Sequence, residues 1–556
     1  LLAFPTAEGF GKYATGGRGG QVVKVTSLED TNDAGTLRWA FNQYPDEPLT
    51  IEFSVSGEIC LTSELRVNRT DWTLAGQTAP GEGIVITHNK VNLGGSENFI
   101  VRNVRFRIGQ KTTGGDILME NALGAENCYN FIFDHCTFGW SVEENMNTAD
   151  SHFLTVQYSI IHEGLYNAGH SKGARGYGSQ WGGSPATYHH NLLCHNNSRS
   201  PRFNGARGED YVVFLEYINN VNYNWGSTGA CYGGENTADI SSYNGLNSAH
   251  ECNFMNNYYK PGPESPSGSV FVSSSYARDG ATSWGPAKWY IDGNIMEGNS
   301  TANADNWTAV TAETYSLDQI RADERIVTET PYYKYTLVGN VGTYDPERYM
   351  LYDFESADDA YNTVVNTAGT INRDVVEQRI ANDVINGTAQ NTGSVSNRKG
   401  IIDLESDAEG FFDYSTEYTV PVDTDEDGMP DDWETAHGLD PNVADQNTLN
   451  AEGYTALEVY LNSLMGEEVN DDFTSSIGNL VVMERPDVSY DRLNSILRVS
   501  DNALGSTLKV YSTDGRLLMT RLISSSEVFL PDLPMGVMLM QVSGNNLCPR
   551  IVKVVK

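Results

Sequence analysis

The chain has 556 residues, with 36 Lys and Arg against 73 Asp and Glu, and a formal net charge of −37. This acidity argues against nucleic acid and anionic membranes as partners, because both require basic protein surface. The length allows a large core and more than one domain, and no apolar run approaches the length of a membrane span.

The opening residues, 1–48, are rich in glycine and contain a strand-like stretch at 21–25. Glycine-rich openings can cradle phosphates, but no Lys followed by Ser or Thr stands at the spacing of a P-loop. We therefore interpret these glycines as turns. We expect Asp33 to cap a short helix at 36–41. Leu1 to Pro5 lack the charged and apolar regions of a signal peptide, so we expect that a leader has been removed.

From about residue 49 a pattern of short strands recurs, each ending in Asn, Asp, Ser or His and followed by a second strand and a variable loop. The clearest copies are 99–106, 131–138, 154–161, 186–193, 214–221, 252–258 and 289–296. A constant unit with variable insertions is typical of a solenoid of parallel strands, in which Asn side chains at equivalent corners form ladders. The alternative, a β-sandwich of hairpins, is weaker because most turns between these strands lack Asn-Gly or Asp-Gly at the two-residue spacing of a hairpin. The seven Cys are scattered, and we expect most to be buried and reduced.

One copy of the repeat leads into Arg199-Ser200-Pro201-Arg202. Pro201 lacks an N–H and restricts the residue before it, so we expect strand pairing to end here on a short, stiff turn. Two Arg side chains at such a turn suit the carboxylates of an acidic substrate, as a clamp or a catalytic group. The alternative is a pair of surface Arg that bridge nearby Asp and Glu.

Two later segments have patterns of their own. Apolar residues at helical spacing predict helices within 355–391, which cover the end of the solenoid or pack along its outside. Residues 423–434 match the twelve-residue EF-hand calcium loop position by position, with Gly428 at position six. The predicted ligands are Asp423, Asp425, Asp427, the carbonyl of Met429, Asp431 and Glu434. Asp440, Asn442 and Asp445 follow and could complete a second site. We expect the whole segment to be a connector that calcium stiffens.

Residues 472–556 form a separate unit in this interpretation. Two strand-like runs flank Asp514-Gly515, a hairpin signal, and three more apolar runs follow. We expect a small antiparallel β-sandwich.

The chain resembles the pectate lyase superfamily, specifically polysaccharide lyase family 1 of the Bacteroidetes type, over roughly residues 3–410. The resemblance rests on four segments: Ala3-Phe4-Pro5 with Glu8-Gly9-Phe10-Gly11, the run 76–81, the run 134–138, and Arg199-Ser200-Pro201-Arg202. The connector resembles a thrombospondin-type-3-like calcium motif, and the tail resembles a C-terminal sorting domain of Bacteroidetes secretion. The implied domains are 1–410, 411–470 and 471–556.

The resemblance implies an all-β fold built on a right-handed parallel β-helix. It implies a secreted, cell-surface or periplasmic enzyme, which we expect to be a monomer, that cleaves polygalacturonate or pectin by calcium-assisted β-elimination. Arg199 matches the catalytic Arg, Arg202 and Lys172 match substrate-binding positions that stabilise the reacting carboxylate, and Asn204 stands where a further Arg is common. The implied calcium ligands are Asp116, Glu143 and Asn147, with Glu144 as a compensating carboxylate and Gly114 where some members carry Asp. From the residues alone, Asp116 and Glu143 would be solvated turn carboxylates.

Two other functions stay open from the sequence. A β-helix hydrolase of the polygalacturonase kind needs an acidic pair, whereas the strand ends carry Asn, His and Arg. A non-catalytic pectin-binding protein is suggested by Asn147 and Asn204, where the family usually has charged residues.

Overall fold

The computed structural model describes residues 1–205, 213–235, 250–275, 287–312, 315–322 and 354–473 except 412, 413, 415 and 416, and most of 486–555. Within 486–555 the exceptions are 493, 501, 502, 505, 513–515, 531, 532, 535, 545 and 546. The chain divides into two compact units, one of residues 1–333 and 348–476 and one that includes 477–556. Among the described residues, no helix combines the length and apolar character that a membrane span requires.

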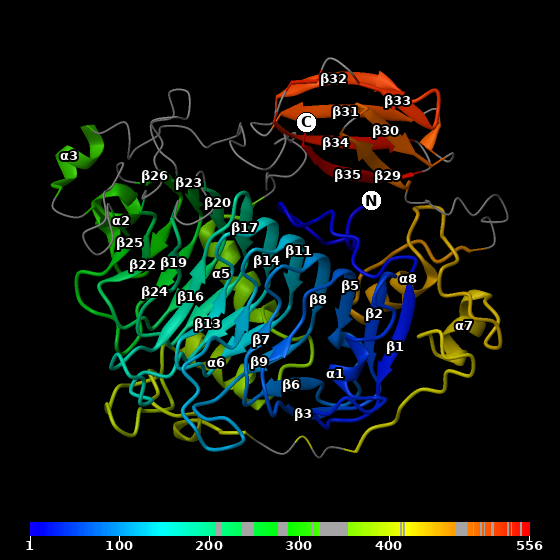
Figure 1. Ribbon diagram of the computed structural model, residues 1–556. Coiled ribbons are helices and arrows are strands. Elements are labelled where there is room, and N and C mark those ends of the chain that lie inside the picture. Colours follow the sequence, from blue (N-terminus) through cyan, green and yellow to red (C-terminus); the bar gives the residue numbers. More distant parts are fainter. Residues whose placement is uncertain are drawn as a thin grey trace. The chain divides into compact units, whose positions relative to one another are not determined.

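The first unit is a parallel β-helix, as the repeat predicts (Figure 1). Three sheets can be traced through the described residues, and each strand pairs in parallel with its equivalent in the next coil. The first sheet contains β1 (Gln21–Val25), β2 (Leu49–Phe53), β5 (Thr70–Ala75), β8 (Glu97–Arg102), β11 (Tyr129–Asp134), β14 (His152–Gln157), β17 (Ala186–His189), β20 (Val213–Ile218), β23 (His250–Met255) and β26 (Lys288–Asp292). The second contains β3 (Gly57–Cys60), β6 (Ile84–Thr87), β9 (Arg105–Arg107), β12 (Thr137–Gly139), β15 (Ile160–His162), β18 (Leu192–Cys194), β21 (Val221–Tyr223), β24 (Tyr258–Lys260) and β27 (Ile295–Met296). The third contains β4 (Leu65–Arg66), β7 (Val91–Asn92), β10 (Leu123–Gly124), β13 (Glu144–Asn147), β16 (Tyr177–Trp181), β19 (Arg202–Phe203), β22 (Gly229–Gly233), β25 (Val270–Ser274) and β28 (Val310–Ala312).

Side chains of successive coils stack because each strand repeats its register on the next. Trp72 stacks on Phe99 at 4.7 Å and Phe99 on Phe131 at 4.6 Å between ring centroids, inside the core. At the bend between the first and second sheets, the predicted Asn ladder is present. The amide of Asn220 donates to Asn257 Oδ1 at 3.2 Å, and that of Asn257 donates to Asn294 Oδ1 at 2.8 Å. These ladders satisfy buried polar groups that the bends would otherwise leave without partners.

The helices predicted within 355–391 are α5 (Ala357–Thr367) and α6 (Val375–Asn386). They pack along the outside of the second sheet, where Val364, Val376 and Ile380 contact its apolar residues Leu192 and Val221. Asp374 begins α6 with a capping box that includes Glu377. The short helices α2 (Ser300–Ala304) and α3 (Leu317–Ala322) lie near the last coils.

The N-terminal helix is shorter than predicted, and the prediction of Asp33 as its capping residue was wrong. It is α1 (Leu37–Ala40), and the Thr36 side chain accepts the hydrogen bond from the Trp39 amide. Asp33 instead accepts from the Thr31 hydroxyl at 3.0 Å. Thr36 is the residue directly before the helix, which is where a capping side chain reaches the first free N–H groups.

The connector packs on the first coils of the β-helix. Its helices are α7 (Asp431–His437) and α8 (Ala456–Leu464), and Met429 and Leu457 share a cluster with Val22 of β1 and Ala75 of β5. Ion pairs also join the two parts, among them Arg18–Glu458 at 2.6 Å and Lys24–Asp423. The connector and the β-helix therefore belong to one packed unit.

The C-terminal unit consists of two antiparallel sheets, as expected for a β-sandwich. One contains β29 (Val488–Asp491), β30 (Ile496–Val499) and β33 (Glu527–Phe529), and the other β31 (Thr507–Ser512), β32 (Leu517–Leu522), β34 (Val537–Gly544) and β35 (Leu547–Val555). Leu497 and Val528 of the first sheet share a core with Leu508, Val510 and Met540 of the second. The predicted turn at 514–515 lies outside the described residues.

Candidate active site

A row of polar side chains runs across the third sheet, one from each of four neighbouring strands. Asn147 of β13 pairs with Gln180 of β16, Gln180 with Arg202 of β19, and Arg202 with Tyr232 of β22. Phe203, the residue after Arg202, lies in the core. Because successive side chains of a strand point to opposite faces, Arg202 and its partners face outward. This polar row therefore follows the axis of the β-helix.

Arg199 lies beside the polar row, in the bend between β18 and β19. Its φ of 57° is in the left-handed region that residues other than glycine seldom adopt. The guanidinium carbon lies 4.0 Å from the centroid of the Tyr177 ring, Nε donates to Tyr232 Oη at 3.2 Å, and Nη1 forms an ion pair with Glu144. The aromatic face, the hydroxyl and the carboxylate together fix the side chain.

The pKa of Arg199 is lowered from its usual value, first by burial and further by the positive charge of Arg202, while Tyr232 opposes the shift. This is the direction that a basic role for Arg199 requires.

Arg202 is held on two sides and is almost completely buried. Its Nη1 donates to Gln180 Oε1 at 2.9 Å, and its Nη2 lies 2.6 Å from Glu235 Oε1. The guanidinium carbon also lies 5.9 Å from the centroid of the Tyr232 ring. The two Arg thus share Tyr232 as a neighbour, so the structure brings together the pair that the sequence singled out.

The implied calcium ligands have separate partners. Glu143 contacts His170 at 2.8 Å and forms an ion pair with Arg175. Glu144 pairs with Arg199, and Asn147 donates to Glu126 Oε1 at 2.8 Å. Asp116 lies on an exposed turn in which its carbonyl accepts from Thr112 N at 2.9 Å. Within the part of the chain that the structure describes, the groups of acidic, His and Cys side chains with converging ligand atoms do not include these four residues. As placed, they do not fit a calcium ion.

The two remaining candidates differ in exposure. Lys172 is exposed on the loop after His170, and its backbone N–H donates to His170 Nδ1 at 2.9 Å. That loop is joined to Glu143 through His170. Asn204 is buried at the end of β19, where its N–H donates to the Trp181 carbonyl at 2.7 Å. Lys172 is thus exposed, whereas Asn204 is buried directly after β19.

Four residues of the site were missed by sequence reasoning: Tyr177, Gln180, Tyr232 and Glu235. Tyr177 is contacted on its faces by two guanidinium groups, of Arg175 at 4.5 Å and Arg199 at 4.0 Å. These residues belong to neighbouring coils and are not close in sequence to Arg199. The register of the third-sheet strands could have identified these four residues. In the sequence, however, those short strands fall within the insertions of variable length between the recurring strand pairs.

The connector contains a second candidate site. Ligand atoms of Asp423, Asp425 and Asp427 converge, and so do those of Asp427, Glu434 and Asp445. Glu434 is fully buried, and neither of its carboxylate oxygens has a hydrogen-bond partner. Burial and the neighbouring carboxylates raise the pKa of Glu434 to about 8 and that of Asp427 to about 6.

These buried anionic oxygens fit a hard divalent cation, because calcium prefers carboxylate and carbonyl oxygens and would neutralise their mutual repulsion. The arrangement differs from the sequence prediction at one position. Asp431 accepts hydrogen bonds from Thr424 N and Thr424 Oγ1, both at 2.7 Å, and among the described residues it is not one of the carboxylates whose ligand atoms converge. Asp445, which the sequence assigned to a second site, is the residue that joins Asp427 and Glu434.

Comparison with curated sequences gives long matches. The chain is 32% identical over 469 residues to "Probable pectate lyase C" of Aspergillus flavus, covering 84% of this chain and 94% of the relative. It is also 32% identical over 472 residues to the protein of the same name from Emericella nidulans, with the same coverage. No family model matches the chain.

Solved structures with similar folds include the cedar pollen allergen jun a 1, with 15% identity, a TM-score of 0.43 and coverage of 66% of this chain and 93% of that one. Pectate lyase C from Erwinia chrysanthemi has 16% identity, a TM-score of 0.39 and coverage of 67% and 99%. The extent and identity of the match to the fungal sequences decide the relationship: the chain belongs to the pectate lyase family.

Proposed function

We propose that this protein cleaves polygalacturonate by β-elimination at the polar row, with Arg199 as the base. Family membership supports the reaction class. The observation that carries the assignment of the site is the position of Arg199, which is buried against Tyr177 and Tyr232 beside the outward-facing Arg202. A row of polar groups along the β-helix axis suits an extended polymer.

In the proposed reaction, Arg199 removes the proton next to the uronate carboxylate. The C–H electron pair forms a double bond to the neighbouring carbon, and the bond from that carbon to the glycosidic oxygen breaks. The oxygen stays on the leaving sugar, keeps the electron pair of the broken bond and takes up a proton from water. The intermediate places additional negative charge on the carboxylate, which the positive charges of Arg202 and Lys172 would stabilise. Arg199 must first separate from Glu144, since a carboxylate partner favours the charged guanidinium.

We also infer that calcium assists the reaction. Asp116, Glu143, Glu144 and Asn147 would need to leave their present partners to surround a cation. The proposed requirement is tested by turnover in the presence of a chelator, followed by addition of calcium. Turnover that the chelator leaves unchanged would mean that Arg and Lys carry the substrate charge without a cation.

The assay of the proposed reaction separates it from the alternatives. The protein is incubated with polygalacturonate and calcium, and both ultraviolet absorbance and reducing ends are followed. A lyase produces an unsaturated, absorbing product. A hydrolase produces reducing ends alone, and a non-catalytic binding protein produces neither signal. The carboxylates Glu144 and Glu235 are each paired with an Arg, which disfavours the acidic pair that a hydrolase needs.

We infer a polysaccharide lyase of family 1 of the Bacteroidetes type, which is secreted and acts as a monomer. The proposed divisions are a catalytic domain at 1–410, a calcium connector at 411–470 that resembles thrombospondin type 3, and a sorting-like domain at 471–556. Calcium in the connector would be held by Asp423, Asp425, Asp427 and Glu434, with the Met429 carbonyl and Asp445. There it would neutralise carboxylates and stabilise the segment.

A further inference from the structure

A third cluster of metal-ligating side chains lies on the second sheet, at the start of the β-helix. Ligand atoms of Glu58, Cys60 and His88 all lie within 4.8 Å of one another. Glu58 and Cys60 are two residues apart on β3 and therefore share a face of that strand. His88 directly follows β6, the next strand of the sheet, in which Thr87 pairs with Cys60.

Contacts around the cluster fix its side chains. The Thr87 hydroxyl donates to Glu58 Oε1 at 2.6 Å and lies 2.8 Å from His88 Nδ1. The His88 ring packs on the Phe411 ring with 4.6 Å between centroids. Thr87 thus orients two of the three candidate ligands, in the way that outer hydrogen bonds orient metal ligands in known sites.

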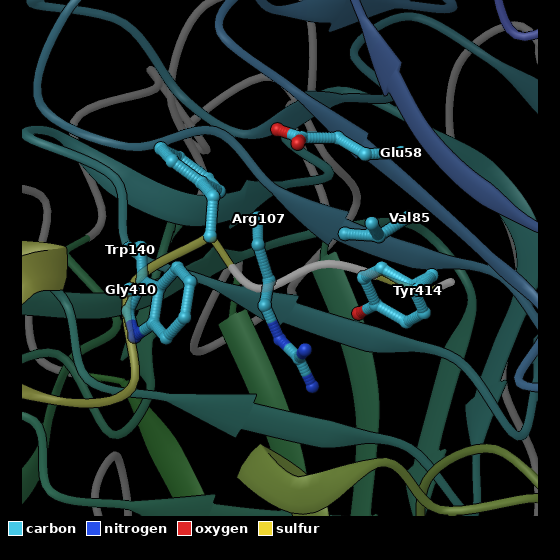
Figure 2. Close-up of a pocket in the computed structure, with 7 residues that line it drawn as sticks. Glu58, Val85, Arg107, Trp140, Gly410 and Tyr414 are labelled. Carbon is cyan, nitrogen blue, oxygen red and sulfur yellow. The ribbon is translucent and has the colours of Figure 1, made fainter. Parts of the chain in front are cut away.

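The cluster is accessible from solvent. Glu58, Cys60 and His88 are each half-buried. Glu58 also lines a small pocket with Arg107 and Trp140, which Figure 2 shows together with Tyr414. An ion could therefore enter without opening of the fold.

We propose that Glu58, Cys60 and His88 form a binding site for zinc or a similar transition-metal ion. A thiolate, an imidazole and a carboxylate are a donor set that suits zinc, whereas calcium takes oxygen ligands. Three protein ligands leave a fourth position for water or another small ligand. This site is independent of the proposed lyase activity, since it lies on the second sheet and the polar row lies on the third.

The test is a titration of the full-length, chelator-treated protein with Co²⁺. Excess calcium is present throughout, so that calcium occupies the carboxylate sites before Co²⁺ is added. We expect one Co²⁺ to bind with a thiolate-to-cobalt charge-transfer band that zinc abolishes by displacement. Cys60→Ser removes the band. Cys60→Ser and His88→Gln each weaken binding by at least about 100-fold because a ligand is lost, and Thr87→Val weakens it by about tenfold.

Two control variants make the result specific. Asp425→Asn changes the connector and His135→Gln removes a half-buried His from another bend, and both should retain the band. If Cys60→Ser does not fold, the weakened Co²⁺ binding of His88→Gln tests the ligand set in its place. Absence of a thiolate band in the folded wild-type protein would overturn the proposal, as would an unchanged band in Cys60→Ser.

Discussion

Buried charges occur in two very different arrangements in this molecule. Under α6, Arg105 of β9 lies 2.8 Å from Glu377, and Arg107 forms an ion pair with Asp374. In the connector, by contrast, Glu434 is buried among other carboxylates. The pKa of Asp374 is lowered because the attraction of the Arg charges exceeds the cost of burial. The pKa of Glu434 is raised to about 8 because burial and like charges act together.

This difference distinguishes buried carboxylates that stabilise the fold from buried carboxylates that could bind a cation. In the α6 network each carboxylate has a cation and further hydrogen bonds, such as that from Tyr414 Oη to Asp374 at 2.8 Å. Such a network is complete without any added group. The connector carboxylates have buried oxygens without a partner, which is costly unless a cation supplies the missing charge. The Arg199–Glu144 pair is a third case, since the proposed reaction requires it to open.

The largest expected effect is the loss of one partner in the α6 network. Arg105→Met leaves Glu377 buried without its nearest cation, and we expect the free energy of unfolding to fall by about 3–5 kcal/mol. Arg321→Met is the matched control, because the Arg321–Asp305 pair is exposed and should contribute about 0–1 kcal/mol. Chemical denaturation of both variants measures the two changes in the free energy of unfolding. Equal losses would show that burial does not distinguish the two pairs.

The next effect concerns the ion pair between Arg199 and Glu144, which must separate in the proposed reaction. Arg199→Ala should lower kcat at least about 100-fold, or about 2.7 kcal/mol in the activation free energy, with a small change in KM. Arg202→Ala should act mainly on KM. Activity of the wild-type protein should rise into the alkaline range, since the pKa of Arg199 is lowered and its neutral fraction grows with pH.

Steady-state kinetics of both variants across pH test this assignment. A near-normal kcat for Arg199→Ala would place the base elsewhere, with Lys172 as the next candidate. If both variants raise KM alone, the two Arg form a carboxylate clamp and not a catalyst.

A smaller effect, with a sign that depends on calcium, is expected for Glu434→Gln. Without calcium, near neutral pH, the variant should be more stable than the wild type by about 1 kcal/mol, because Gln avoids the free energy lost when folding raises the pKa of Glu434. With calcium it should be less stable and more sensitive to protease near residues 420–440, while lyase activity persists. Asp431→Asn is the control, since Asp431 faces Thr424. Thermal melting with and without calcium gives the comparison, and identical behaviour of the two variants would contradict the ligand set.

The smallest effect is the opposite pH response of the two regions. Carboxylates with lowered pKa values, such as Asp374, stabilise the fold above their ordinary pKa, and this stabilisation is lost as the pH falls below it. Glu434 has a raised pKa, so the metal-free connector should lose stability as the pH rises from about 4.5 to about 8. Local hydrogen exchange across pH, with calcium as the control, separates the two. A connector that becomes more stable over this window without calcium would contradict the assignment.

The sequence predicted the β-helix because each coil repeats two strands around a polar bend, and the Asn residues of those bends are visible in the chain. It did not reveal the third sheet, whose strands are short and lie within insertions of variable length. That sheet carries the polar row, so Arg199 and Arg202 were found from their local motif while Tyr177 and Tyr232 were missed. The connector loop was recognised because its candidate ligands are contiguous. Asp445 was placed in a different site because it is brought to Glu434 by folding.

The packing of the connector on the first coil sets an order of events during synthesis. Val22 and Lys24 of β1 emerge early, and β1 pairs with β2, which follows it in the chain. Their partners Asp423 and Leu457 are translated some 400 residues later. Until then the connector cannot cover the surface that Val22 and Lys24 present. The last segment of the first unit therefore packs on its first strands, and the unit is complete only when that segment has been synthesised.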